Sequence, residues 1–230
     1  MNDEVVIETF LYVPLIIDIE ETDILSYDIN TGYLLTDDKE LELIECNFEL
    51  VKEMKKTVEK CIKLLEKVFN SKLQSCGSVS FLGGTLEVDR LLLSVEERGE
   101  DVDYIPVVME FKRIDNRDLR RSVLAQLLEY MTAMHLDPQK IIGACKESGV
   151  DFDIDNLKKN MEERRIRGVI LSEDIPEIVE KTIEFLNEEL SNSEIYGIEL
   201  KRLCSSDKEH KVIIPVNRCY NRGRKKEKEN

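Results

Sequence analysis

Two neighbouring segments of the chain place acidic residues and a lysine at spacings that suit metal-ion chemistry. Glu110 and Lys112 stand two residues apart, and so do Glu87 and Asp89. Because side chains of a β-strand alternate between its faces, each pair would project from one side of its strand. If the two strands are adjacent and antiparallel, opposed Cβ atoms lie about 4.5–5.5 Å apart, so two carboxylates can share one cation. We therefore predict a site for Mg²⁺ or Mn²⁺, which prefer oxygen ligands.

These residues also have a simpler interpretation. An acid and a lysine at the end of a strand can form an exposed ion pair that contributes little. Glu87, in particular, is more typical of a solvent-facing side chain than of a metal ligand. The elements around the charged residues therefore decide between the two interpretations.

Hydrophobic periodicity predicts a regular order of elements around these residues. Segment 104–112 is apolar on both faces until its charged end, which is typical of a strand in a covered sheet. An amphipathic helix over 50–69 and a strand, glycine turn and strand over 77–95 precede it. The sequence then predicts a helix over 117–135, weak helical spacing around 154–164, a strand over 167–171, a helix from a capping box at Asp174 to Leu190, a strand over 195–200 and a late edge strand over 212–216.

The combination of these features resembles the signature of the PD-(D/E)XK nuclease superfamily. Asp89, a gap of 20 residues and then Glu110-Phe111-Lys112 at a strand end match its central motif. Gln126 and Tyr130 resemble the Gln-x-x-x-Tyr element that several branches carry on the next helix. The segment 166–172 is similar to the strand that commonly follows, and the resemblance covers about residues 46–203.

Two positions depart from the family pattern. Val88 stands where a proline sometimes precedes the aspartate, and Glu87 stands where many relatives have a basic residue. The second departure implies that contacts to DNA or to the metal near this strand differ from those of the relatives.

The resemblance implies a role for each matching residue. Asp89, Glu110 and the carbonyl of Phe111 would hold the Mg²⁺ or Mn²⁺ ion, and Lys112 would orient or help to activate water. Gln126 and Tyr130 would position phosphate or water. The candidate contacts to the DNA backbone are Arg117, Arg120 and Arg121, and the first-helix acids that would complete such a site are Glu49, Glu53 and Glu59, among which the sequence does not choose.

Composition limits the other chemistries. Six cysteines show no C-x-x-C spacing and are interpreted as reduced thiols, and two histidines make a histidine-based metal site improbable. The net charge of −15 is concentrated in residues 1–50, which hold 14 acidic residues and one lysine. The other 180 residues hold 34 acids and 32 bases, so the overall acidity does not exclude DNA as a partner.

We therefore expect an α/β fold with a restriction-endonuclease-like core, in which helices flank a central mixed sheet. The expected organisation is an acidic β-element over 1–45, a nuclease core over 46–216 and a basic, disordered tail over 217–230. The expected activity is Mg²⁺-dependent hydrolysis of DNA, with an endonuclease favoured over an exonuclease. The alternatives are a nuclease-fold binding or scaffold module without turnover, and an RNA-directed relative.

The remaining expectations concern the surroundings of the protein. No apolar run approaches the roughly 20 residues of a membrane span, and the first residues lack the basic start of a signal peptide, so we expect a cytoplasmic protein. No helicase-type phosphate loop occurs. A homodimer is compatible with the fold, because cutting two strands often requires two active sites.

Overall fold

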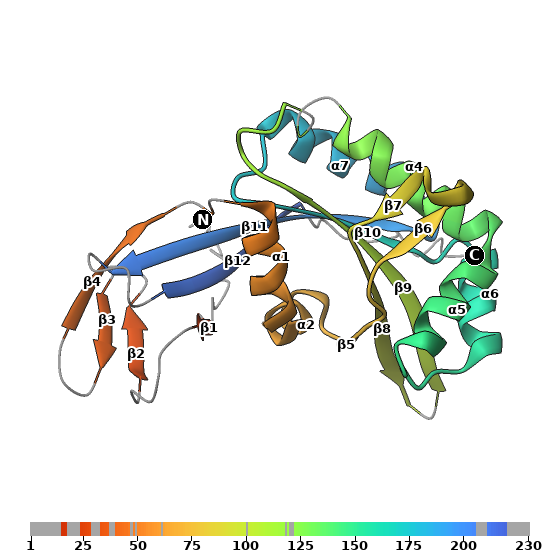
Figure 1. Cartoon of the computed structure of the whole chain (residues 1–230), viewed down its shortest axis with the longest axis horizontal. Coiled ribbons are helices and arrows are strands. Elements are labelled where there is room, and N and C mark those ends of the chain that lie inside the picture. The colour runs from red at the N-terminus through yellow and green to blue at the C-terminus, as the bar shows by residue number, and fades with distance from the viewer. Residues whose placement is uncertain are drawn as a thin grey trace, which may run out of the picture.

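A mixed β-sheet forms the centre of the computed structural model (Figure 1). The structure describes residues 15–17, 24–28, 33–36, 40–46, 48, 50–60, 62–99, 101–117, 119, 122–205 and 211–219. The parallel strands β9, β10 and β11 are joined to the antiparallel strands β8 and β5. This confirms the predicted α/β class with a mixed sheet. In spatial order the central strands are β5 (Lys72–Ser75), β8 (Arg90–Arg98), β9 (Asp101–Lys112), β10 (Arg167–Ser172) and β11 (Glu194–Ser205).

Further strands extend this sheet beyond β11. β12 (Lys211–Cys219) pairs antiparallel with β11, and β1 (Leu15–Ile17) pairs with β12. β4 (Glu40–Glu45) pairs with the end of β11 and continues to β3 (Tyr33–Thr36) and β2 (Ile24–Asp28). Figure 1 shows β2, β3 and β4 at the far end of the ribbon formed by β11 and β12, away from the helices.

These strands change two expectations about the ends of the chain. The sequence predicts an edge strand over 212–216, but β12 lies between β11 and β1 and runs on to Cys219. Strand pairing therefore extends into the first residues of the tail that is predicted from 217. Residues 220–230 and the β-rich segment 5–13 lie outside the described residues.

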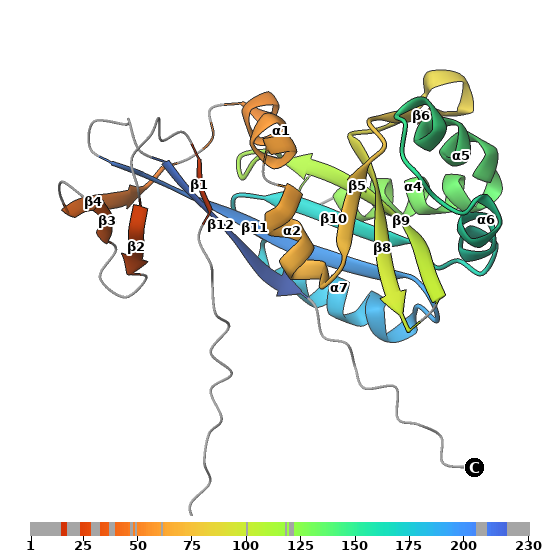
Figure 2. The ribbon, with the colours of Figure 1, turned by 90° about the horizontal axis from the view of Figure 1, so that it is seen from below.

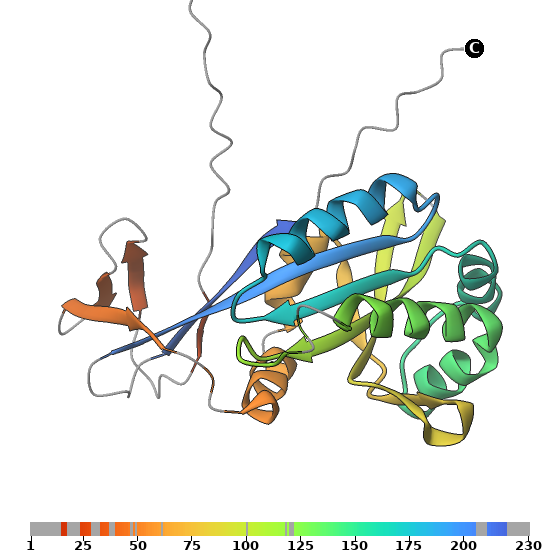
Figure 3. The same ribbon diagram turned by 90° about the horizontal axis from the view of Figure 1, so that it is seen from above.

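Helices cover both faces of the sheet, because its central strands are apolar on both sides. On one face lie α4 (Val123–Leu136) and α7 (Glu177–Glu189), as Figure 3 shows. On the other face lie α1 (Val51–Lys60) and α2 (Ile62–Phe69), as Figure 2 shows. Within β9, Val108 belongs to the core under α4, whereas Val107 and Met109 belong to the core under α1 and α2.

The structure moves several predicted helix boundaries. The helix predicted over 50–69 is described as α1 and α2, on either side of residue 61. α4 begins at Val123 rather than at 117, and α7 begins at Glu177 without a side-chain cap from Asp174. Two helices occupy the polar segment that has only weak helical spacing: α5 (Pro138–Glu147) and α6 (Ile154–Glu162).

One predicted strand is divided in two, and this division shapes the site. The strand predicted over 85–95 bends at Asp89 and becomes β7 (Leu86–Val88) and β8. β7 leaves the main sheet and pairs with β6 (Val79–Phe81) across the short 3₁₀ turn η1 (Leu82–Gly84). Glu87 therefore lies on β7, whereas Asp89 is the bend residue before β8, although sequence spacing places them on one strand.

Gly168 in β10 lets α4 pack closely on the sheet. A methyl group at this position would lie 2.8 Å from Leu127 Cδ2 and 2.8 Å from Met131 Sδ, both of which are buried in the core under α4. Such contacts are too short for ordinary carbon atoms, so either the side chains or the helix must move. Because α4 also carries Gln126 and Tyr130, this packing determines how far these side chains lie from the sheet.

We expect Gly168→Ala to lower the free energy of unfolding by about 1–3 kcal/mol through overpacking. Gly143→Ala is the matched control, because a methyl group added there, in the middle of α5, has no atom within 4 Å apart from its chain neighbours and the backbone of its own helix. Urea unfolding of both variants measures the difference. Equal stability of the two variants would show that α4 does not depend on close approach at Gly168.

The cysteines do not all follow the sequence interpretation. Cys46 is disulfide-bonded, so the expectation of a reduced thiol is wrong at this position. Sequence spacing excludes C-x-x-C clusters but does not report pairs that the fold brings together. Cys76 and Cys145 are free and buried, with their Sγ atoms 2.9 Å apart. The hydrogen bond from Cys145, together with burial, raises the pKa of the Cys76 thiol, which disfavours its reactive thiolate.

Candidate active site

Asp89 and Glu110 meet at the junction of β8 and β9. Arg90 is opposite Met109 in the antiparallel register, so Asp89 precedes β8 at the position that faces Glu110. Asp89 Oδ2 accepts a hydrogen bond of 3.1 Å from the backbone N–H of Phe111. The two predicted metal-binding carboxylates are therefore brought together by the register of β8 and β9 and by the hydrogen bond from β9 to Asp89.

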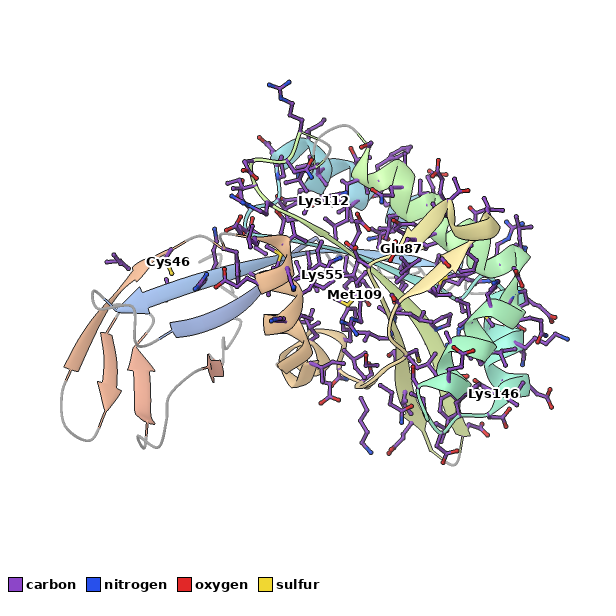
Figure 4. The ribbon with its side chains drawn as sticks, viewed as in Figure 1. Cys46, Lys55, Glu87, Met109, Lys112 and Lys146 are labelled. Atoms are coloured by element: carbon purple, nitrogen blue, oxygen red, sulfur yellow. The ribbon has the colours of Figure 1, made fainter. Side chains whose placement is uncertain are left out.

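Lys112 lies on the same face of β9 as Glu110, at the end of the strand (Figure 4). Its Nζ atom is 2.7 Å from Glu110 Oε1, and the two side chains are only 12% and 4% exposed. This is not the weak surface pair of the simpler interpretation, because both charges are largely removed from water.

A chain of hydrogen bonds connects Lys112 to α4. The Lys112 ammonium donates to Gln126 Oε1 at 3.1 Å, and Gln126 Nε2 donates to the hydroxyl of Tyr130. Gln126 and Tyr130 are one helical turn apart and so share a face of α4. The structure thus brings together all five residues that the sequence predicts for the catalytic site: Asp89, Glu110, Lys112, Gln126 and Tyr130.

The carboxylate of Glu110 is in an electrostatically strained position. Burial raises its pKa most, the nearby Asp89 raises it further, and the contact with Lys112 lowers it only in part. Burial and the charge of Glu110 likewise raise the pKa of Tyr130. Within the part of the chain that the structure describes, Glu110 Oε2 is buried and has no hydrogen-bond partner. A buried carboxylate oxygen without a donor has unused capacity to bind a cation.

These features fit a divalent cation held by Asp89, Glu110 and the carbonyl of Phe111. A positive ion between the carboxylates would remove the repulsion that raises the pKa of Glu110. In the described residues, no group of three or more acidic, cysteine or histidine side chains is arranged to hold a metal. The two carboxylates would therefore leave several coordination positions to water, as is usual for Mg²⁺.

The first helix contributes a lysine to the site, and of the three candidate acids Glu53 is paired elsewhere. Lys55 on α1 forms an ion pair with Asp89 Oδ1, and its Nζ atom lies 6.0 Å from the centre of the Phe111 ring. Glu53 instead forms an ion pair of 2.8 Å with Arg202. Glu49 lies outside the described residues, as does the side chain of Glu59. The sequence offers no signal for Lys55, because α1 carries several lysines at similar spacing.

Two polar residues lie beside the site although the sequence did not predict them there. Ser172 on β10 is the register partner of Lys112, and Glu199 on β11 is the register partner of Ser172. Paired residues of parallel strands share a face, so these three form one row beside the site. Ser172 is completely buried, and its Oγ atom has no hydrogen-bond partner among the described residues. Glu199 accepts a hydrogen bond of 3.0 Å from the backbone of Ile175.

The other residues singled out by the sequence lie outside this centre. Glu87 is exposed on β7, as the simpler interpretation predicts (Figure 4). Arg117 is exposed and precedes α4, so its expected place in the first turn of the helix is wrong. Arg117 and Ser122 are both turn residues, and α4 begins only after Ser122. Arg120 and Arg121 lie outside the described residues.

Comparisons with known proteins give no assignment for this fold and site. No family model matches the chain, and neither the curated proteins nor the solved structures yield a match. In the part of the chain that the structure describes, none of the helices has both the length and the apolar character of a membrane span.

Proposed function

We propose that this chain is a metal-dependent nuclease of the PD-(D/E)XK type, with a restriction-endonuclease-like core, that hydrolyses phosphodiester bonds of DNA. The observation that carries the proposal is the position of Asp89 opposite Glu110, next to the buried ammonium of Lys112. Two carboxylates and an ammonium in one partly enclosed site match what phosphodiester hydrolysis requires: a place for a hard cation and stabilisation of charge on the phosphoryl oxygens.

Each side chain has a defined role in this proposal. A bound Mg²⁺ or Mn²⁺ ion would supply positive charge at the phosphate and make water more acidic. Asp89 and Glu110 would hold that ion, and the backbone N–H of Phe111 keeps Asp89 in place. Lys112 would orient the attacking water, while Gln126 keeps the lysine in position through its hydrogen bond. Tyr130 in turn holds Gln126, so α4 serves to position the lysine.

Endonuclease activity on DNA remains the favoured form of this proposal. Arg117 is exposed and is a candidate contact to the DNA backbone. Cleavage of both strands of a duplex would need two active sites, which a homodimer would provide. Cleavage of closed circular DNA, which has no ends, separates an endonuclease from an exonuclease, and a matched RNA separates the two substrate classes.

A binding module without turnover is the alternative, and one observation favours it. Each carboxylate of the site already has a lysine partner, because Asp89 pairs with Lys55 and Glu110 pairs with Lys112. A cluster with this balance of charge can persist without a cation. The two functions differ in whether the site binds a divalent metal, so metal binding distinguishes them.

We expect the wild-type protein to bind Mn²⁺ with millimolar or tighter affinity in isothermal titration calorimetry and to cleave circular DNA with Mn²⁺. In Asp89→Ala, the dissociation constant should rise at least about tenfold, because one of two carboxylate ligands is lost. Lack of Mn²⁺ binding by a folded wild-type protein would exclude the nuclease and leave the binding module. Unchanged binding in the variant would remove Asp89 from the site.

A further inference from the structure

Lys55 occupies the side of Asp89 that faces away from the β9 backbone. Asp89 Oδ2 is held by the N–H of Phe111, whereas Oδ1 carries the Lys55 ammonium. The two side chains are 32% and 21% exposed, so this pair is less enclosed than the pair of Glu110 with Lys112. Lys55 therefore sits on the open side of the site, on a flexible side chain that reaches in from α1 (Figure 4).

Lys55 is not needed to attach α1 to the sheet. Met54 and Val58 of the same helix are buried in the core that also contains Phe111. Burial of such apolar side chains holds a helix to a sheet far more strongly than one partly exposed ion pair. The contact of Lys55 with Asp89 therefore calls for an explanation other than helix packing.

The charges of the site explain why this lysine would have to move. Without a metal, the negative charges of Asp89 and Glu110 are matched by Lys55 and Lys112. A divalent cation between the carboxylates would take the place of the Lys55 ammonium on Asp89, because two cations in contact with one carboxylate oxygen repel each other. The site would then carry an excess of positive charge, which an anionic phosphodiester can neutralise.

We propose that Lys55 is an exchangeable substrate-binding residue: it neutralises Asp89 in the metal-free protein and contacts the phosphodiester of bound nucleic acid once a divalent cation takes its place. This inference rests on the proposed nuclease function and adds to it a residue that competes with the metal and then binds the substrate. A lysine suits this exchange, since its ammonium is a compact charge on a long flexible stem.

The test uses Lys55→Met, which removes the ammonium but keeps an apolar stem next to Phe111. Lys56→Met is the matched control, because Lys56 is the adjacent, exposed residue of α1 and has the same charge. In calorimetry without nucleic acid, Lys55→Met should bind Mn²⁺ with a dissociation constant about two- to five-fold lower than that of the wild type. Lys56→Met should bind Mn²⁺ like the wild type.

The rate of DNA cleavage at saturating Mn²⁺ should fall in Lys55→Met, although the variant binds Mn²⁺ more tightly. In Lys55→Met the Mn²⁺ concentration for half-maximal cleavage should fall, whereas the rate at saturating Mn²⁺ should drop about tenfold through loss of a phosphate contact. Lys55→Arg, which retains a cation, should restore part of the rate. A lysine with a purely structural role would not produce this combination of tighter metal binding and slower cleavage.

The outcomes separate this inference from the proposed function. If the wild type binds Mn²⁺ and cleaves DNA, but Lys55→Met binds Mn²⁺ equally or more weakly, the inference is overturned and the nuclease stands. The inference is also overturned if Lys56→Met gains as much affinity for Mn²⁺ as Lys55→Met, because the gain would then come from the lower net positive charge of α1 in general. If neither the wild type nor Lys55→Met binds Mn²⁺ or cleaves DNA, the proposed function and the inference fail together.

Discussion

Replacement of Lys112 by methionine is expected to lower the rate of DNA cleavage by about a thousandfold, which is the size of effect that loss of a preorganised charge has in an enclosed site. The Lys112 ammonium lies 2.7 Å from Glu110 and 3.1 Å from Gln126, and its side chain is only 12% exposed. Lys112 contacts Glu110 Oε1, whereas Glu110 Oε2 has no hydrogen-bond partner among the described residues, so Lys112 is the cation that contacts this buried carboxylate. Single-turnover cleavage of a labelled duplex with Mn²⁺ measures the effect.

The effect on Glu110 adds to the loss of the ammonium. Contact with Lys112 lowers the pKa of Glu110, so without the lysine this pKa should rise further. A higher pKa means that Glu110 stays protonated to a higher pH, and the protonated form cannot bind a cation. The deficit in cleavage should therefore be larger at acidic than at alkaline pH.

Lys146→Met is the control for this prediction. Lys146 is exposed on α5, far along the molecule from Lys112 (Figure 4), so its removal changes the net charge by the same amount without touching the site. It should cleave DNA at the wild-type rate. Equal activity of wild type and Lys112→Met would point to a contaminating nuclease and would remove the assignment of the lysine.

Arg167→Met should produce the largest change in stability, a loss of about 3 kcal/mol in the free energy of unfolding. Arg167 is only 5% exposed. Its guanidinium contacts Glu194 at 2.9 Å, Ser94 Oγ at 2.7 Å and the carboxylate of Glu96. These partners lie on β11 and β8, so one side chain links three strands, and its removal would take a charged donor from three polar groups at once. For a chain of this size the unfolding temperature should fall by about 6–12 °C.

The control compares this buried network with an exposed ion pair. Lys181 and Glu184 on α7 are 60% and 32% exposed, so Lys181→Met should leave the unfolding temperature close to that of the wild type. Thermal unfolding of both variants gives the comparison. Arg167 starts β10 whereas Lys112 ends β9, so Arg167→Met should retain the wild-type cleavage rate at temperatures where it is folded. A fall in unfolding temperature for Arg167→Met that is no larger than that for Lys181→Met would contradict the prediction.

Most of the acidic charge of the chain lies away from the proposed site, so it does not prevent binding of a polyanion such as DNA. The N-terminal fifty residues hold most of the negative excess, and their strands β2, β3 and β4 lie at the far end of the ribbon of β11 and β12 (Figure 1). The proposed site lies among β8, β9 and α4, in the part of the chain whose acids and bases nearly balance. Distance and salt screening would therefore keep the acidic strands from repelling DNA at the site.

Several parts of the site could be predicted from the sequence because they depend on short-range periodicity. Glu110 and Lys112 share a face because a strand repeats every two residues, and the apolar run before them indicates a buried strand. Gln126 and Tyr130 share a face because they are one helical turn apart. The structure connects all four in one chain of contacts, from Glu110 through Lys112 and Gln126 to Tyr130.

The remaining parts depended on contacts between distant segments, for which local periodicity carries no information. Asp89 faces Glu110 because of the register in which β8 pairs with β9, and the pairing of β7 with β6 separates it from Glu87. Lys55, rather than Glu53, reaches Asp89 because of how α1 packs on the sheet. The burial of Ser172 and the disulfide at Cys46 likewise follow from tertiary packing. The amino-acid sequence by itself determined which side chains share a face of one strand or helix. Only the tertiary structure decided which of these faces meet, because packing of the whole core sets the pairing of remote segments.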